Sequence, residues 1–145
     1  MTRAYIGGTF DLFHIGHVFL LSRAKSEFDE VVVALNTDAF CERYKGERPI
    51  MDLSERAAVV AACRYVDKVE VNDGCEDSTL AILRVAPTHI IHGDDWKGKS
   101  LKKQMGLTDA FLVDNGIELV YFPYTERTST KDIKERVCER RLTTS

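Results

Sequence analysis

The sequence lacks the features that mark disulfide frameworks, structural zinc sites and membrane proteins. Its four cysteines, Cys41, Cys63, Cys75 and Cys138, are scattered and form no Cys-x-x-Cys pair. We therefore expect free thiols, and neither disulfides nor a zinc site. No apolar run approaches the roughly 18 residues of a membrane-spanning helix, and no signal-peptide pattern opens the chain. These absences predict a cytosolic protein that has no membrane partner.

An excess of positive charge is also lacking. The chain has 20 Lys and Arg against 23 Asp and Glu, a net charge of −3. This balance excludes a general nucleic-acid or membrane-surface binder, although a local basic pocket is compatible with it. With 145 residues, of which 44% are hydrophobic and 30% charged, the chain suits one domain with a packed core. Because no repeat, linker or low-complexity segment divides it, we predict a single domain over residues 1–145.

Short apolar stretches alternate with helical stretches along the whole chain. Residues 31–35 form a β-branched run typical of a strand buried on both faces. Five alternations predict an α/β, Rossmann-like domain, in which helices cover both faces of a five-stranded parallel sheet. Ligands bind such sheets at the carboxyl ends of the strands, where the strand order reverses. The expected strands are 4–6, 30–36, 66–71, 88–92 and 117–121. The expected helices are 18–25, a short second helix that begins at residues 37–40, and then 52–64, 78–85, 100–115 and 128–141.

A glycine-bordered turn with two histidines follows the first expected strand. Gly7 and Gly8 allow a ligand to approach the backbone, because they carry no Cβ. The start of the next helix offers free N–H groups to an anion such as phosphate. His14 and His17 are three apart, so one helix face can direct both at that anion.

Residues 8–17, Gly-Thr-Phe-Asp-Leu-Phe-His-Ile-Gly-His, resemble the signature of the cytidylyltransferases within the nucleotidyltransferase superfamily. The spacing is that of the bacterial glycerol-3-phosphate enzymes. The resemblance implies that His14 and His17 stabilise the transition state of nucleotidyl transfer as donors to phosphate oxygens. The alternative is a pair of capping or surface histidines. The resemblance also implies that the nucleotide is contacted by Gly8, Thr9, Phe10 and Asp11. It implies that Asp11 contacts the acceptor as well.

Basic residues in the following loop provide a candidate cation for the β- and γ-phosphates. Members of the family place lysines after the second helix, and Lys45 lies there, in a polar loop expected over residues 43–50. The resemblance therefore makes Lys45 a catalytic candidate, with Arg43 and Arg48 as competitors. The alternative is a solvated basic loop, since such charges are usually found on the surface.

The next expected helix provides candidates for binding the acceptor phosphate. Arg56 and Arg64 are eight residues apart, and therefore lie on roughly one helix face. Residues 64–67, Arg-Tyr-Val-Asp, resemble a cytidylyltransferase segment, which implies that Arg64 binds the acceptor while Asp67 holds it in place. Alternatively, Arg64 only complements the dipole at the helix carboxyl end.

Two further segments resemble the family near the nucleotide. Residues 93–96, Gly-Asp-Asp-Trp, follow the fourth expected strand, and there Asp94 can accept from ribose hydroxyls or a base amine, or bind Mg²⁺. Residues 124–130 resemble the family segment Arg-Thr-x-Gly-Ile-Ser-Thr-Thr, which implies phosphate contacts by Thr128, Ser129 and Thr130.

The sequence departs from the family at two of these places. Tyr124 stands where the family has arginine, and Arg127 stands where it has glycine, so Arg127 can supply the missing cation. Residues 72–78 are acidic and lack the lysine with which the glycerol-3-phosphate enzymes help to hold their acceptor. The second departure leaves the acceptor open without affecting the nucleotide half of the site.

Taken with the resemblance, these motifs predict transfer of CMP from CTP to a small phosphorylated alcohol. Glycerol 3-phosphate is the first expected acceptor, giving CDP-glycerol and pyrophosphate, with Mg²⁺ carried by the nucleotide and no dedicated metal site. Family members of this size are typically homodimers, so the resemblance implies a homodimer here. The alternatives are another acceptor such as ethanolamine phosphate or a hydroxyalkylphosphonate, ATP in place of CTP, or a nucleotide-binding module without turnover.

Overall fold

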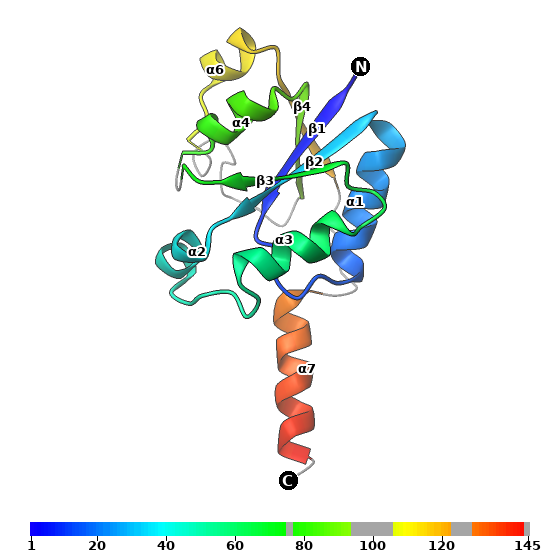
Figure 1. The fold of residues 1–145 in the computed structure, drawn as a ribbon, viewed down its shortest axis with the longest axis vertical. Helices are drawn as coiled ribbons and strands as arrows, with labels where there is room; N and C mark the ends of the chain where they lie inside the picture. Colours follow the sequence, from blue (N-terminus) through cyan, green and yellow to red (C-terminus); the bar gives the residue numbers. More distant parts are fainter. Residues whose placement is uncertain (75–76, 94–105, 123–128, 144–145) are drawn as a thin grey trace.

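The computed structural model describes residues 1–74, 77–93, 106–122 and 129–143. Strands and helices alternate along the chain, as the sequence predicts (Figure 1). The strands are β1 (Arg3–Gly8), β2 (Glu30–Asn36), β3 (Lys68–Asn72), β4 (His89–Gly93) and β5 (Glu118–Phe122). The helices are α1 (Ile15–Glu27), α2 (Asp38–Lys45), α3 (Leu53–Ala61), α4 (Thr79–Val85), α6 (Asp109–Asp114) and α7 (Thr130–Thr143).

The strands form one parallel sheet in the order β3-β2-β1-β4-β5. This confirms the predicted five-stranded parallel sheet. The chain builds outward from β1 through β2 to β3, and then returns to the other side of β1 with β4 and β5. The strand order therefore reverses between β1 and β4, and a crevice is expected at the carboxyl ends of these two strands.

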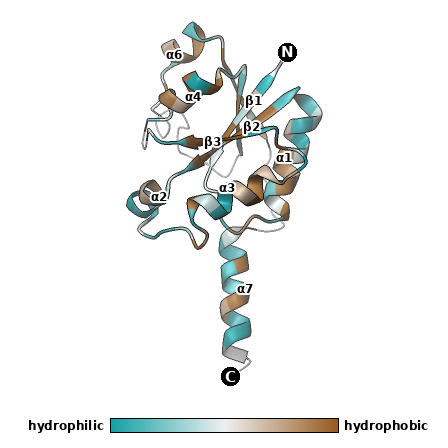
Figure 2. Ribbon diagram, in the orientation of Figure 1, coloured by the Kyte–Doolittle hydropathy of each residue, from teal (hydrophilic) through white to brown (hydrophobic). Residues whose placement is uncertain are grey.

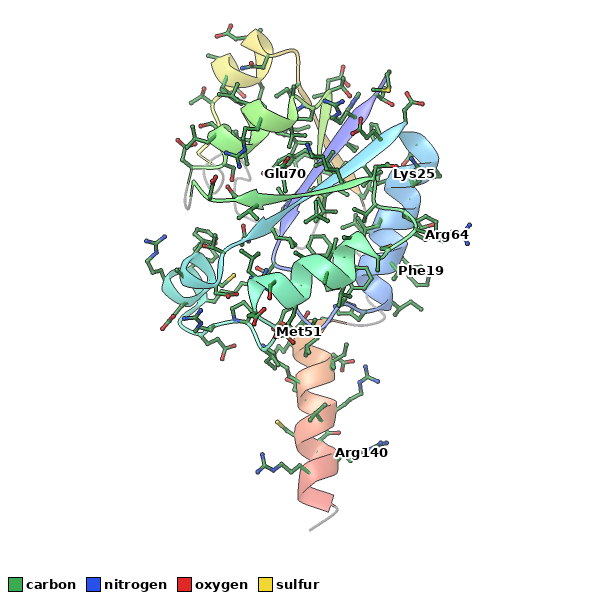
Figure 3. All side chains as sticks on the ribbon, viewed as in Figure 1. Phe19, Lys25, Met51, Arg64, Glu70 and Arg140 are labelled. Atoms are coloured by element: carbon green, nitrogen blue, oxygen red, sulfur yellow. The ribbon has the colours of Figure 1, made fainter. Side chains whose placement is uncertain are left out.

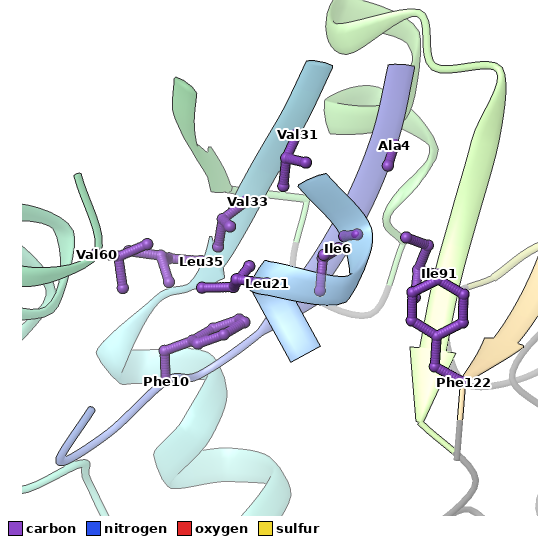
Figure 4. Packing of buried hydrophobic residues seen from close by; sticks show 11 residues of the cluster. Ala4, Ile6, Phe10, Leu21, Val31, Val33, Leu35, Val60, Ile91 and Phe122 are labelled. Carbon is purple, nitrogen blue, oxygen red and sulfur yellow. The ribbon is translucent and has the colours of Figure 1, made fainter. Parts of the chain in front are cut away.

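Side chains of successive strand residues point to opposite faces of the sheet, which gives two cores. On one face Ile6 packs with Val33 of β2, Leu21 of α1 and Val60 of α3 (Figure 4). On the other face Tyr5 packs with neighbours from β2, α4, β4 and α6. In Figure 2 hydrophobic residues are prominent in the sheet and in α3, whereas α7 is largely hydrophilic. Helices on both faces confirm the layered α/β architecture.

Several element boundaries differ from the sequence prediction. Helix α1 begins at Ile15 instead of residue 18, because His14 caps it and Gly16 continues the first turn. Helix α2 extends to Lys45, where Gly46 ends it in a left-handed conformation (φ 83°) that glycine adopts at little cost. Helix α3 ends at Ala61, so Arg64 lies beyond it.

Helix α7 begins against the body of the protein and then extends away from it (Figure 1). Ser129 caps this helix, because its hydroxyl oxygen accepts a hydrogen bond from the N–H of Asp132 (3.0 Å). In the described part of the chain, no helix combines the length and hydrophobicity needed to cross a bilayer.

Candidate active site

A cavity of about 560 Å³ opens at the carboxyl ends of β1 and β4, where the strand order reverses. It takes backbone from the glycine turn, side chains from α1, and charged residues from the loop after α2 and from the start of α7. Its volume lies within the range of small-molecule sites. The residues that line it are Ile6, Gly7, Gly8, Thr9, Phe10, Asp11, His14, Gly16, His17, Leu20, Cys41, Lys45, Glu47, Arg48, Pro49, Ile91, His92, Ser129, Thr130, Lys131 and Lys134.

The turn between β1 and α1 has an unusual backbone. Phe10 (φ 55°) and Leu12 (φ 51°) both adopt the left-handed region that side chains other than glycine rarely occupy. Such strain is found where the surrounding structure enforces it, often at functional sites. Gly8 is required here, because a Cβ at this position would lie 2.9 Å from Cε2 of Phe10. The turn thus presents backbone to the cavity while Phe10 is packed into the core.

The two histidines are held side by side by the first turn of α1. The N–H of Gly16 donates to Nδ1 of His14, and the N–H of His14 donates to Nδ1 of His17, each over 3.1 Å. The rings stack with their centroids 3.8 Å apart and their planes 29° apart. Since both Nδ1 atoms accept a hydrogen bond, the neutral rings carry their proton on Nε2. The predicted pair therefore reaches the cavity as two Nε2–H donors.

Burial keeps these imidazoles neutral. It lowers the pKa of His14, and it lowers the pKa of His17 to about 3, with a smaller effect from the neighbouring His14 in the same direction. The carboxylate of Asp11 opposes that shift of the His17 pKa. Neutral rings donate to phosphate oxygens without being strong acids, and a bound polyanion would raise their pKa because it favours the protonated form.

Asp11 organises the loop that faces the histidines. Its carboxylate accepts the backbone N–H groups of Ile50 (2.8 Å) and Met51 (3.0 Å), and its carbonyl accepts the Thr130 hydroxyl (3.0 Å). These bonds join the glycine turn, the loop before α3 and the start of α7. Asp11 lies in the cavity wall, and its carboxylate already joins the glycine turn to the loop before α3.

Lys45 lies in the cavity wall at the end of α2, where the sequence places the candidate cation. Its competitor Arg48 also lines the cavity, but this guanidinium lies 3.6 Å from Asp38 and 3.8 Å from Glu42. Arg43 is not part of the cavity wall. The geometry therefore favours Lys45 over Arg43, and adds Arg48 as a second cation at the mouth.

The prediction that Arg56 binds the acceptor phosphate is wrong, because Arg56 is a structural residue. Its side chain is fully buried and lies outside the cavity wall. The guanidinium donates to the carbonyls of Met51 (3.0 Å), Thr9 (2.8 Å) and Asn36 (2.9 Å). It also pairs with Asp38 at 2.7 Å. Four of the five guanidinium N–H groups thus tie α3 to the glycine turn, β2 and α2.

Arg64 and Asp67 also lie elsewhere than predicted. They are found on the side of the molecule where the strands begin, whereas the cavity lies where the strands end. The Asp67 carboxylate accepts the N–H of Val31 (2.8 Å) at the amino end of β2 and pairs with Lys25 (2.9 Å). Arg64 lies over the ring of Tyr65, 5.8 Å from its centroid. Figure 3 shows Arg64 near the far end of α3 from Met51. From this side neither side chain can reach an acceptor in the cavity of its own chain.

The remaining predicted residues divide between the cavity and the part of the chain that is not described. Ser129 and Thr130 line the cavity, as does the Thr9 side chain. Asp94, Arg127 and Thr128 lie outside the described residues.

Several cavity residues were missed by the sequence analysis, among them Cys41, His92, Lys131 and Lys134. Cys41 presents a buried thiol 3.4 Å from the Thr9 hydroxyl, and His92 is the next-to-last residue of β4, with a pKa that burial lowers to about 4. Lys131 and Lys134 enter from the first turns of α7. The His92 position carried a signal, since it directly precedes the Gly-Asp-Asp-Trp segment at the end of a strand. The lysines carried none, because α7 is charged on all sides.

The described residues contain no cluster of three or more His, Cys, Asp or Glu side chains that could hold a metal ion. Asp11 is the carboxylate nearest the histidines in sequence, and both of its oxygens already accept backbone N–H groups.

Comparison with known proteins agrees with this geometry. A family model described as cytidylyltransferase-like matches residues 5–136. The chain is 36% identical over 137 residues to glycerol-3-phosphate cytidylyltransferase of Bacillus subtilis strain 168, covering 94% of this chain and 98% of that protein. It is 34% identical over 142 residues to FAD synthase of Pyrococcus horikoshii, covering 94% of this chain and 93% of that protein.

A solved structure supports the same relationship. The lipopolysaccharide core biosynthesis protein from Thermoplasma volcanium GSS1 superposes with a TM-score of 0.70 at 27% identity, covering 87% of this chain and 99% of that one. The family match spans nearly all of the sheet and reaches the cavity-lining turns of α7. The chain therefore belongs to the cytidylyltransferase-like family of nucleotidyltransferases.

Proposed function

We propose that this protein transfers CMP from CTP to a small phosphorylated alcohol, with glycerol 3-phosphate as the first candidate acceptor. The observation that carries the proposal is the stacked pair His14 and His17, whose Nε2–H groups serve a cavity at the strand-order reversal. The Bacillus subtilis relative, named a glycerol-3-phosphate cytidylyltransferase, covers nearly the whole chain and supports this acceptor.

In the proposed reaction an oxygen of the acceptor phosphate attacks the α-phosphorus of CTP. The bond from that phosphorus to the oxygen bridging to the β-phosphate breaks, and pyrophosphate leaves with the electron pair. The transfer needs little covalent help from the protein, which must align the two phosphates and stabilise the charge that develops. The Nε2–H groups of His14 and His17 donate to phosphate oxygens, and Lys45 neutralises charge on the leaving group.

Backbone and hydroxyl groups complete the proposed nucleotide site. Gly8 and Thr130 line the cavity, where the Thr130 hydroxyl donates its proton to the Asp11 carbonyl. The Ser129 hydroxyl accepts the N–H of Asp132 and keeps its own proton for a phosphate oxygen at the start of α7. Mg²⁺ accompanies the nucleotide and shields its phosphates, and Asp11 can contact the ion through water. We also propose a homodimer, as the family resemblance implies, which sedimentation at several protein concentrations would test.

A second candidate is transfer of AMP from ATP, which the similarity to FAD synthase favours. The decisive experiment follows pyrophosphate release with CTP or ATP, each paired with glycerol 3-phosphate, ethanolamine phosphate, a hydroxyalkylphosphonate or riboflavin phosphate. Release with CTP and glycerol 3-phosphate, at a kcat/KM well above every other pair, is the expected result. Preference for another pair would replace the acceptor or the nucleotide. No release with any pair would favour a binding module without turnover.

A further inference from the structure

Helix α7 brings Lys134 into the cavity wall, although no sequence motif predicted this lysine. The Nζ atom of Lys134 lies 3.6 Å from Oε1 of Glu47 and 3.9 Å from Oδ2 of Asp11. Its side chain is only 32% exposed, whereas that of Glu47 is 73% exposed. Lys134 therefore lies at the junction of α7, the glycine turn and the loop after α2.

Neither carboxylate uses the hydrogen-bond donors of this lysine. Both distances exceed the reach of a hydrogen bond, and within the described ranges Lys134 donates no hydrogen bond. Asp11 has its own partners, because both of its oxygens accept backbone N–H groups at 2.8 and 3.0 Å. The ammonium is thus held near the cavity by charge alone, and its three N–H groups are available to a ligand.

The first turns of α7 hold this lysine in position. The Thr130 hydroxyl donates to the carbonyl of Asp11 (3.0 Å), and Ser129 caps the helix. Lys134 lies four residues after Thr130, on the same face of the helix. The same contact that attaches α7 to the glycine turn therefore directs Lys134 into the cavity.

We propose that Lys134 binds the β- and γ-phosphates of the nucleotide, and then the pyrophosphate that leaves. This deepens the proposed function, on which it rests for the identity of the ligand. A polyphosphate carries several negative charges and offers oxygens at hydrogen-bond distance, so it competes well with two carboxylates that lie beyond that distance. Lys45 from α2 and Lys134 from α7 then hold the leaving group between two elements.

The alternative is an ion pair that only attaches α7 to the body. In that case the loss of either charge would loosen the helix. If Lys134 is instead a phosphate ligand, Glu47 competes with the phosphate. Glu47→Gln is then expected to strengthen the binding of pyrophosphate a few-fold, the modest effect of an exposed charge.

The test measures pyrophosphate binding by calorimetry in the presence of Mg²⁺, without any acceptor. Lys134→Gln is expected to weaken binding by about tenfold or more, the usual effect of losing a hydrogen bond to a charged group. Lys134→Arg should restore part of the affinity, because it keeps the charge. Arg136→Gln is the matched control: it removes one positive charge from α7, but Arg136 is 62% exposed, pairs with Asp132 and lies outside the cavity wall.

Several results would overturn the assignment. These are unchanged affinity in Lys134→Gln, an equal loss in Arg136→Gln, weaker binding in Glu47→Gln, or a folding defect in Lys134→Gln that Lys134→Arg does not repair. Circular dichroism and thermal unfolding of each variant detect that defect. Because the measurement uses pyrophosphate alone, it is independent of the acceptor. Failure to turn over any acceptor would contradict the proposed function only, whereas turnover with unchanged pyrophosphate binding in Lys134→Gln would contradict the role of Lys134 only.

Discussion

The imidazoles of His14 and His17 show how local sequence can specify a site. The three-residue spacing and the intervening Gly16 are sufficient to predict two rings on one face at a helix start. The hydrogen bonds that turn Nε2 of each ring toward a ligand are local as well, since they join residues two and three apart. The low pKa of His17 results chiefly from burial, and the rings of Phe10 and Phe13 lie beside its imidazole.

Replacing either histidine should remove a transition-state donor. We expect His14→Ala and His17→Ala each to lower kcat by about 100-fold or more, as for other donors that stabilise developing charge. The measurement is pyrophosphate release at saturating substrates, with urea unfolding to detect the loss of the His14 cap, which costs about 1 kcal/mol in other helices.

His89→Ala is the control for this prediction. His89 lies at the amino end of β4, 3.3 Å from Glu118 and outside the cavity wall. This variant should keep its kcat within a few-fold of the parent value. A decrease of only a few-fold in the His14 and His17 variants would contradict their role.

Lysine and arginine residues show the limit of prediction for single side chains. Lys45 and Arg56 are both cations of segments that follow the glycine turn in the sequence. The Lys45 side chain is exposed, whereas the Arg56 side chain is completely buried. The sequence assigns both to ligands. The assignment fails for Arg56, because its burial depends on how α3 packs against three other elements.

Helix α3 is the element whose role changed most. A capping box of Asp52 and Glu55 begins it, and the guanidinium of Arg56 joins it to carbonyls of the glycine turn and β2. The helix therefore supports the back of the glycine turn, and Arg56 lies outside the cavity wall.

Substitution of Arg56 should therefore affect stability before affinity. Arg56→Leu leaves Asp38 and three backbone carbonyls without their partner, which should lower the free energy of unfolding by about 3–5 kcal/mol. Urea unfolding measures this loss. If the variant were as stable as the parent protein and had only a raised KM for the acceptor, Arg56 would be a ligand and the structural role would be wrong.

Helix α7 shows what a sequence can tell about an element and what it cannot. Its start near residue 128 was predictable, and in the structure Ser129 caps it. Which of its charged residues enter the cavity was not predictable. The helix is charged around its whole circumference, so the contact between Thr130 and Asp11 decides which face is turned inward.

At the scale of the whole molecule, the position of the site follows from the sheet. Parallel strands bring their carboxyl ends to one edge, and the reversal between β1 and β4 leaves the crevice there. Asp67 lies beside Val31, near the amino end of β2. The cavity lies near the carboxyl end of β2, where Leu35 pairs with Gly8, about 13 Å further along the strand. The length of the strands thus separates the Arg-Tyr-Val-Asp segment from the cavity.

The buried histidines should make the folded protein sensitive to acid. The pKa of His17 is about 3 in the fold against an ordinary value of 6.5. As the pH falls below 6.5, the unfolded chain therefore binds a proton that the folded chain does not, and the free energy of unfolding decreases. His14 and His92 act in the same direction, because burial lowers the pKa of each.

Urea unfolding between pH 6.5 and about 4.5 tests this prediction, because carboxylates titrate mainly below that window. His17→Asn cannot take up the proton, so its stability should fall less steeply with decreasing pH than that of the parent protein. Identical slopes for the two proteins would mean that His17 is not held neutral by the fold.

The sequence by itself determined the order of strands and helices, the glycine turn, the histidine pair and the family resemblance. These are patterns of neighbouring residues, and their physical causes act over one or two turns of chain. Only the tertiary structure decided which cations surround the cavity: Lys134 enters it, Arg56 is buried behind it, and Arg64 lies on the side where the strands begin. The reason is that the distance of a side chain from the site depends on strand order and helix packing, which no short stretch of sequence contains.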